Sequence, residues 1–438
     1  TIRDINTRFG VCASDSVFAL SALSFDLSVY DIFGVLAVGG HLVLPEDSER
    51  RDPSVWLQRL AAHPVTIWNS VPTLWQMFIE YGEALEQMPR LALLSGDWVP
   101  TRLPAESYRF SPETKLVSLG GATEAAIWSI AYDISREDPP PGWKSIPYGR
   151  ALTHQSVDVL HEDLSPCPDD VVGEIFIGGR GVALGYIGDA SLTDSRFITH
   201  PRRGEKLYRT GDMGRWRGNG QIEFLGRQDT QVKINGFRIE LGEIEEALLS
   251  LDSVAAAVAA VMPTGGAGSL VGYIVSQDAQ SPPDKEDIRA ALRNRLPLYM
   301  VPQRYVFLDR LPLTDNGKVD RKRLPPPGRE ESGADEKGTE LEEQIRDVVA
   351  KHLGTRLFSL DDRFFDLGAT SLLMVKIHRD LCQVLSKPIA LIQLFEAPSV
   401  RALARLISGK ESNAADEGRA HAEKRLAARA SRRGKMGK

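Results

Sequence analysis

The chain of 438 residues has little cysteine and no long apolar run. Its three cysteines, Cys12, Cys167 and Cys382, have neither paired spacing nor a nearby histidine cluster, which argues against a disulfide framework, a zinc site or a redox pair. No apolar run reaches the roughly 20 residues that cross a bilayer, and no signal peptide opens the chain. We therefore expect a cytoplasmic protein that does not bind a membrane.

A large charge of one sign is also missing. The 53 basic and 59 acidic residues give a formal charge of −6, so no field over the whole molecule would recruit nucleic acid. Hydrophobic residues make up 42% of the chain, which is enough for two or three cores. The chain opens on Thr1 in a polar stretch, and we interpret it as a fragment of a longer protein.

Short β-rich apolar runs alternate with amphipathic helical segments between residues 16 and 130. This alternation predicts a largely parallel sheet covered by helices, with strands at 65–68, 91–94 and 115–119. Each of these runs ends in small or polar residues, namely Asn69-Ser70, Ser95-Gly96 and Gly120-Gly121. Because ligands bind beyond the carboxyl ends of strands in open sheets, a small-molecule site is expected there.

The residue composition and the expected secondary structure change further along the chain. Short strands rich in glycine and valine begin near Gly173 and end near Arg227, and a second α/β unit follows. A proline-rich stretch from Pro325 reads as a linker. Thr339 and Glu342 then form a capping-box pattern that opens a small helical domain.

Two polar motifs are hard to explain by packing alone. The run 208–212, Tyr-Arg-Thr-Gly-Asp, places the Asp212 carboxylate on an expected tight turn, where it could grip the two hydroxyls of a ribose. The run 226–240 follows as a long string of polar residues between glycines.

These motifs resemble the adenylate-forming superfamily, and more closely the adenylation domains of nonribosomal peptide synthetases followed by a peptidyl carrier domain. Further motifs agree in order, at 25–31, 121–124, 173–186, 311–320 and 364–372. The resemblance implies an α/β fold in five parts. These are a truncated adenylation large subdomain (1–228), a small mobile α/β subdomain (229–324), a linker (325–338), a four-helix carrier domain (339–408) and a basic tail (409–438).

The resemblance also implies a nucleotide site for ATP. Asp212 would hold the ribose hydroxyls, Arg227 would lie near the ribose and phosphate, and Gly121 would border the nucleotide. Glu124 would ligate Mg²⁺ beside Thr123. Attack of a carboxylate on the α-phosphate brings anions together, so cations must neutralise the developing charge.

Four further positions take roles from the same resemblance. Lys318 would supply the ammonium that stabilises the transition state. Asp229 would be the hinge of the small subdomain, and Gly236 would lie beside the thiol tunnel. Ser371 would carry 4′-phosphopantetheine, whose thiol attacks the aminoacyl adenylate.

The resemblance places the amino-acid pocket at nine positions, which are Asp26, Leu27, Tyr30, Asn69, Leu93, Ser95, Leu119, Ile127 and Trp128. The Asp26 carboxylate pairs with an α-ammonium, which favours an α-amino acid over a fatty or aryl acid. The other positions are mostly apolar and resemble a cysteine-type pocket. A thiol is a small hydrophobe, whereas a serine hydroxyl would lose more hydration there.

The sequence departs from the family pattern in three places. No Gly/Ser/Thr-rich phosphate loop precedes Phe25, so a backbone cradle for the outer phosphates of ATP is absent. Gly120 stands where the family often carries an aromatic residue that stacks on adenine, so adenine must pack against something else. Ala369 and Thr370 replace residues common in the carrier motif.

The sequence therefore predicts a ligase that activates an amino acid, with L-cysteine favoured, and loads it on its own carrier domain. Expected partners are a phosphopantetheinyl transferase and neighbouring modules such as condensation or heterocyclisation domains. Two alternatives remain: an acyl-CoA ligase-like enzyme, and a noncatalytic carrier or docking fragment that lacks the phosphate loop.

Overall fold

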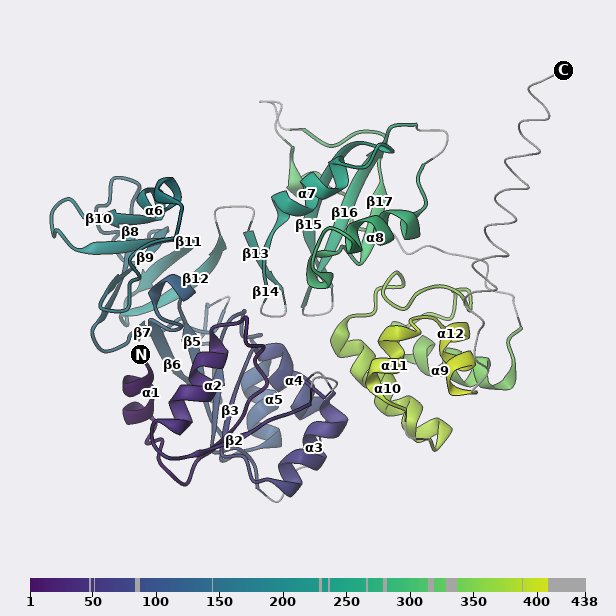
Figure 1. The fold of residues 1–438 in the computed structure, drawn as a ribbon, viewed down its shortest axis with the longest axis horizontal. Helices are drawn as coiled ribbons and strands as arrows, with labels where there is room; N and C mark the ends of the chain where they lie inside the picture. The colour runs from purple at the N-terminus through teal and green to yellow at the C-terminus, as the bar shows by residue number, and fades with distance from the viewer. Residues whose placement is uncertain are drawn as a thin grey trace. The chain divides into compact units, whose positions relative to one another are not determined.

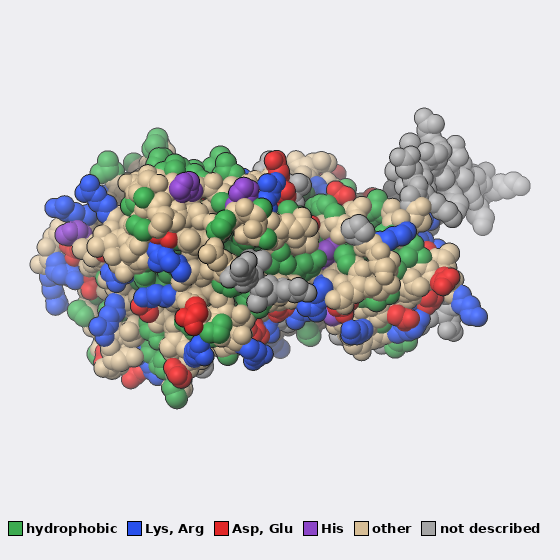
Figure 2. All heavy atoms as spheres, turned by 90° about the horizontal axis from the view of Figure 1, so that it is seen from below, with side chains coloured by type: hydrophobic (Ala, Val, Ile, Leu, Met, Phe, Trp, Pro, Cys, Tyr) green, Lys and Arg blue, Asp and Glu red, His purple; other side chains and the backbone are tan. Residues whose placement is uncertain are grey.

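The computed structural model describes residues 1–46, 49–50, 52–82, 87–143, 145–227, 231–234, 237–264, 267–278, 282–313, 319–327, 337–387 and 389–408 (Figure 1). The chain forms two compact units, Thr1–Gly328 and Arg329–Lys438, and each is described by itself. No helix among the described residues is both long and apolar enough to cross a membrane. On the face that Figure 2 shows, basic side chains lie among acidic ones rather than in one patch.

A seven-stranded sheet in the order β2-β1-β3-β4-β5-β6-β7 forms the first part of unit 1. Its strands are β1 (Ser16–Phe18), β2 (His41–Val43), β3 (Ile67–Ser70), β4 (Leu91–Leu94), β5 (Lys115–Gly120), β6 (Ile130–Ile134) and β7 (Arg150–Ala151). Pairing is parallel from β2 to β5, and β6 and β7 join antiparallel. The predicted, largely parallel sheet is confirmed.

Helices cover both faces of this sheet (Figure 1). The helices are α1 (Ile2–Arg8), α2 (Leu27–Leu36), α3 (Pro53–Ala62), α4 (Pro72–Tyr81), α5 (Leu103–Phe110) and a 3₁₀ turn, η1 (Thr123–Ala125). Successive strand residues point to opposite faces. Ile67 therefore packs with the buried residues of α1 and α2, whereas Trp68 stacks on Phe78 of α4.

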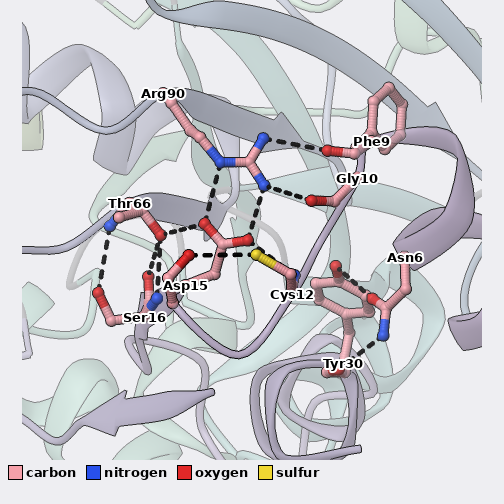
Figure 3. Close-up of polar contacts among 11 residues, drawn as sticks. Asn6, Phe9, Gly10, Cys12, Asp15, Ser16, Tyr30, Thr66 and Arg90 are labelled. Carbon is pink, nitrogen blue, oxygen red and sulfur yellow. Dashed lines mark hydrogen bonds and ion pairs between the residues drawn. The ribbon is translucent and has the colours of Figure 1, made fainter. Parts of the chain in front are cut away.

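Polar contacts tie together the amino ends of the central strands (Figure 3). Arg90 forms an ion pair with Asp15 at 2.7 Å and donates to the carbonyl of Phe9. Burial raises the pKa of Asp15, but the bonds from Arg90, Thr66 and the Cys12 backbone outweigh it and bring the pKa down to about 2. The Thr66 hydroxyl donates to Asp15 in this network. Strand β3 begins at Ile67, two residues later than predicted, and includes Asn69 and Ser70.

A second sheet in the order β10-β11-β9-β8, with β12 paired to β11, completes the large part of unit 1. Its elements are β8 (Gln155–Leu160), β9 (Gly173–Gly179), α6 (Ala190–Arg196), β10 (Phe197–Thr199), β11 (Lys206–Arg217) and β12 (Gln221–Arg227). The predicted glycine- and valine-rich β layer is confirmed.

The expected tight turn at Asp212 is wrong, because Asp212 lies inside the long strand β11. The pairing register of β11 with β9 shifts between Arg209 and Met213, and Gly211 has a φ of 77°. Glu174 holds this irregular segment by accepting from Arg209 and from the Gly211 backbone at 3.0 Å. A kink in a strand, rather than a turn, therefore presents the Asp212 carboxylate.

The small part of unit 1 contains two further sheets, β13-β14 and β15-β16-β17. The elements are β13 (Gln231–Ile234), β14 (Phe237–Glu240), α7 (Leu241–Leu249), β15 (Val254–Thr264), β16 (Ala267–Ser276), α8 (Lys285–Arg293), η2 (Leu298–Met300), β17 (Arg304–Phe307) and η3 (Arg321–Arg323). Its own core gathers around Ile244, Leu248 and Leu292.

The described part of unit 2 is a helical domain made of α9 (Glu340–Leu353), α10 (Ser371–Leu385), α11 (Leu391–Glu396) and α12 (Val400–Ile407). Its core includes Ile345, Phe364 and Leu381. The predicted capping box forms, with Thr339 accepting from the Glu342 backbone.

Candidate functional site

The structure joins two of the predicted site motifs by a hydrogen bond. Asp26 lies just before α2, and Thr123 opens the 3₁₀ turn that follows β5. The Thr123 hydroxyl donates to Asp26 Oδ2 at 2.7 Å, although 97 residues separate the two. The predicted amino-acid anchor and the predicted nucleotide motif therefore meet at one edge of the sheet.

Burial raises the pKa of Asp26 above its ordinary value. The Thr123 hydrogen bond and the positive charge of Lys233 on β13 oppose this rise, while the nearby Glu124 carboxylate adds to it. A partly buried carboxylate of this kind gains from a cationic partner, because pairing offsets the cost of desolvation. The α-ammonium of an amino acid is such a partner.

Beside Asp26, the predicted pocket positions lie together. Five of them belong to one buried cluster between α2 and the sheet, with Ile127 packed against it, and these are Leu27, Tyr30, Leu93, Leu119 and Trp128. The Trp128 indole N–H donates to the Ser95 hydroxyl at 3.0 Å, so the Ser95 oxygen has a hydrogen-bond partner within the protein. Asn69 lies opposite Leu93 in the pairing of β3 with β4. The predicted pocket positions beside Asp26 are therefore mostly apolar, with Asn69 and Ser95 as the polar exceptions.

Asn69 is oriented by a buried carboxyl group that the sequence did not single out. Its side-chain N–H donates to Asp31 Oδ1 at 2.7 Å, and Asp31 is 1% exposed. Among the described residues, Asn69 Oδ1 and Asp31 Oδ2 have no hydrogen-bond partner. Burial raises the pKa of Asp31 to about 7, against the opposing effects of Asn69, Ser21 and Arg50.

Asn6 fixes the ring of Tyr30 from α1 (Figure 3). The Tyr30 hydroxyl donates to Asn6 Oδ1 at 3.1 Å, and Asn6 Nδ2 donates to the Gly34 carbonyl at 2.7 Å. The ring centroid of Tyr30 lies 5.0 Å from that of Trp128. Because its hydroxyl is bonded to Asn6, Tyr30 contributes an aromatic face to the cluster.

The predicted magnesium ligand Glu124 accepts a hydrogen bond from the Tyr186 hydroxyl at 2.7 Å. Mg²⁺ in nucleotide sites is commonly held by one or two carboxylates together with the substrate phosphates. One oriented carboxylate beside Thr123 fits that requirement. When bound, the ion would neutralise charge on the phosphates.

Asp212 and Arg227, predicted to bind ribose and phosphate, form a close ion pair. They face each other across β11 and β12, and Arg227 Nη1 donates to Asp212 Oδ1 at 2.6 Å. Gly121 needs to be glycine, because an added Cβ would lie 2.6 Å from the carbonyl oxygen of Ile127. The glycine therefore allows the backbone of residues 127–129 to pack closely against position 121.

Four predicted positions cannot be placed as side chains. Lys318, Asp229 and Gly236 lie outside the described residues. Ser371 is the first residue of α10, and its side chain is not among those described. Thr370, not Ser371, caps this helix, by accepting from the Leu373 backbone at 3.2 Å.

The chain matches three family models in order. They are the AMP-binding enzyme over residues 1–187, the AMP-binding enzyme C-terminal domain over 243–318 and the phosphopantetheine attachment site over 343–407. The chain is a nonribosomal peptide synthetase adenylation domain followed by a carrier domain. Enzymes of this family use ATP and Mg²⁺, and the carrier domain bears 4′-phosphopantetheine.

Several known proteins resemble this adenylation and carrier pair. Pyochelin synthetase PchF from Pseudomonas aeruginosa is 50% identical over 278 residues, which cover 63% of this chain and 15% of that protein. The anguibactin system regulator from Vibrio anguillarum is 46% identical over 329 residues, which cover 73% of this chain and 31% of the regulator. The chain thus spans less than a third of each.

One solved structure of an adenylation and carrier protein, holo-PA1221 bound to a vinylsulfonamide inhibitor, matches with a TM-score of 0.73 and 26% identity. The match covers 90% of this chain and 66% of that one. It confirms the predicted fold class, a mixed α/β adenylation unit with a helical carrier domain.

Proposed function

We propose that this adenylation and carrier pair activates an α-amino acid, with L-cysteine favoured, and loads it on the Ser371 pantetheine arm. In the first step a carboxylate oxygen of the amino acid bonds to the α-phosphorus of ATP, and pyrophosphate leaves. In the second step the arm thiol, after losing its proton, bonds to the carbonyl carbon, and AMP leaves. A phosphopantetheinyl transferase would attach the arm, and neighbouring synthetase modules would accept the loaded residue.

The observation that carries this proposal is the hydrogen bond from Thr123 to Asp26. It places a carboxylate suited to an α-ammonium next to the motif of Glu124, the expected Mg²⁺ ligand. An amino acid bound at Asp26 would thus have its own carboxylate near the nucleotide phosphates. Binding both reactants in one site holds the carboxylate close to the α-phosphate, which lowers the entropic cost of bringing the two anions together.

Cysteine is favoured by the chemistry of the pocket residues. Leu27, Leu93 and Leu119 are almost fully buried and suit a side chain of low polarity. The Asn69 oxygen, which has no hydrogen-bond partner among the described residues, adds one acceptor that a thiol could use. A serine hydroxyl could use it too, but would lose more hydration on burial. Lys318 and the Asp229 hinge complete the proposal as predicted residues outside the described ones.

ATP–pyrophosphate exchange with a panel of amino acids, performed on the intact gene product, tests the proposal. Cysteine should give the highest exchange, above serine, valine and 2-aminobutyrate. Higher exchange with serine or valine would reject the cysteine assignment. Release of free acyl-CoA would favour the acyl-CoA ligase-like alternative, which Asp26 argues against. No exchange with any amino acid would favour a noncatalytic carrier or docking role.

A further inference from the structure

The space beside Gly120 is filled by the side chain of a distant residue. Gly120 ends β5, at the position where the family pattern often has an aromatic residue. A Cβ atom added at Gly120 would have three nearest heavy atoms, all within 2.7 Å, and all three belong to the ring of Tyr148. The Tyr148 ring therefore occupies the volume that a side chain at position 120 would take.

Tyr148 is held in this place by backbone pairing and by ring packing. Its backbone N–H donates to the Ile222 carbonyl at 2.8 Å, and the next residue, Gly149, forms a β-bridge with Ile222. Its ring centroid lies 5.6 Å from that of Phe224 on β12. Tyr148 as a whole is partly exposed, whereas its hydroxyl lies in buried surroundings.

The neighbours of the Tyr148 hydroxyl belong to the predicted nucleotide site. Burial and the Asp212 carboxylate raise the pKa of Tyr148, whereas the Gly121 backbone N–H and the Arg227 guanidinium act in the opposite direction. Adenine is bonded directly to ribose, so it must lie next to the residues that hold the ribose hydroxyls. Tyr148 is an aromatic residue at that place.

We propose that Tyr148 supplies the aromatic face on which the adenine of ATP stacks. The Tyr148 ring replaces the aromatic side chain that is missing at position 120. The inference rests on the proposed function, because it assumes that ATP is bound through Asp212 and Arg227. The ring face would provide the attraction, so the hydroxyl is dispensable for it.

The KM for ATP in the exchange reaction of the intact gene product tests this assignment. Loss of one stacked base contact in Tyr148→Leu should raise the KM for ATP about tenfold. The KM for the amino acid should change less than twofold, since Asp26 and the pocket residues are untouched. Tyr148→Phe keeps the ring and should retain the KM for ATP. An unchanged KM for ATP in folded Tyr148→Leu would overturn the assignment.

Two further variants separate stacking from a structural role. Trp98→Leu is the matched control, because Trp98 packs on Phe224 with centroids 4.9 Å apart and is 46% exposed. Its KM for ATP should change less than twofold, and a larger rise than in Tyr148→Leu would assign the stacking to Trp98 instead. The double variant G120Y/Y148A returns the aromatic group to position 120. The double variant should recover most of the ATP affinity that Y148A loses. If a folded double variant does not recover it, an aromatic side chain at position 120 does not replace Tyr148, which contradicts the inference.

A second measurement keeps this inference separate from the proposed function. Wild-type exchange with no amino acid would reject the proposed function, yet adenine binding could still be mapped by photolabelling with 2-azidoadenosine triphosphate. Label on the peptide that contains Tyr148, prevented by excess ATP, supports the inference. ATP-protected label confined to other peptides overturns it.

Discussion

Replacing Asp31 by asparagine should change how the free energy of unfolding depends on pH, because the variant should gain stability relative to wild type as the pH rises. Asp31 is 1% exposed, and burial raises its pKa from an ordinary 3.8 to about 7. A carboxyl group with a raised pKa favours the folded state when it is protonated. Its contribution is therefore fully present below about pH 4 and is lost as the pH rises through about 7.

The magnitude follows from the size of the shift. The pKa rises by about three units, and each unit corresponds to about 1.4 kcal/mol, so ionisation of Asp31 costs the folded state about 4 kcal/mol by pH 8. Asparagine keeps an oxygen that can accept from Asn69 but cannot ionise. Its new N–H group at the Oδ2 position costs about 1–3 kcal/mol if it finds no acceptor. That cost is the same at every pH.

Relative to wild type, Asp31→Asn should therefore be less stable at pH 4 and more stable at pH 8. The difference between the two free energies of unfolding should rise by about 4 kcal/mol across that interval. The comparison cancels the titration of other groups, such as Asp15, that are the same in both proteins.

Tryptophan fluorescence during urea denaturation measures this difference selectively. All seven tryptophans lie in the first 216 residues, and they are Trp56, Trp68, Trp75, Trp98, Trp128, Trp143 and Trp216. The signal thus reports the large part of the adenylation unit and not the carrier domain. Parallel pH profiles for the two proteins would show that Asp31 does not titrate between pH 4 and 8, and would refute the reasoning.

Four further substitutions test the proposed chemistry. Asp26→Asn should raise the KM for the amino acid at least about tenfold by removing the partner of its ammonium; an unchanged KM would reject that role. Tyr186→Phe should raise the Mg²⁺ concentration for half-maximal exchange about tenfold, because Glu124 loses the bond that orients it; an unchanged Mg²⁺ titration would contradict this. Ser371→Ala should abolish loading, seen by intact mass, but leave exchange; loss of both in a folded protein would disagree. Lys318→Ala should suppress exchange but leave Ser371 open to phosphopantetheinylation, and normal exchange would exclude Lys318.

The predictable part of the fold comes from patterns within short windows of sequence. The strands near 91–94 and 115–119 follow from local periodicity, and the structure confirms them. The capping box at Thr339 has a fixed spacing and was equally readable. The motif around Asp212 predicts a turn, but a glycine with positive φ, such as Gly211, suits both a turn and an irregular strand. Only the pairing of β11 with β9 and β12 distinguishes them.

The supporting contacts of the site have no comparable local signal. Asn69 reaches Asp31 across 38 residues, and Tyr186 reaches Glu124 across 62. Each pair exists because the fold brings together elements that lie far apart in the chain, so neither partner marks the other in the sequence. Motifs identify the residues expected to contact the substrate, whereas the groups that orient those residues are apparent only in the folded chain.

Tyr148 and Gly120 illustrate why a departure from a family motif need not remove a function. The motif reading finds only that position 120 lacks an aromatic side chain. The structure shows that the Tyr148 ring occupies the volume that a side chain at position 120 would take. A tyrosine at position 120 would therefore collide with the Tyr148 ring unless residue 148 is made smaller. Reduced thermal stability of Gly120→Tyr, restored in G120Y/Y148A, would express that dependence independently of any ligand.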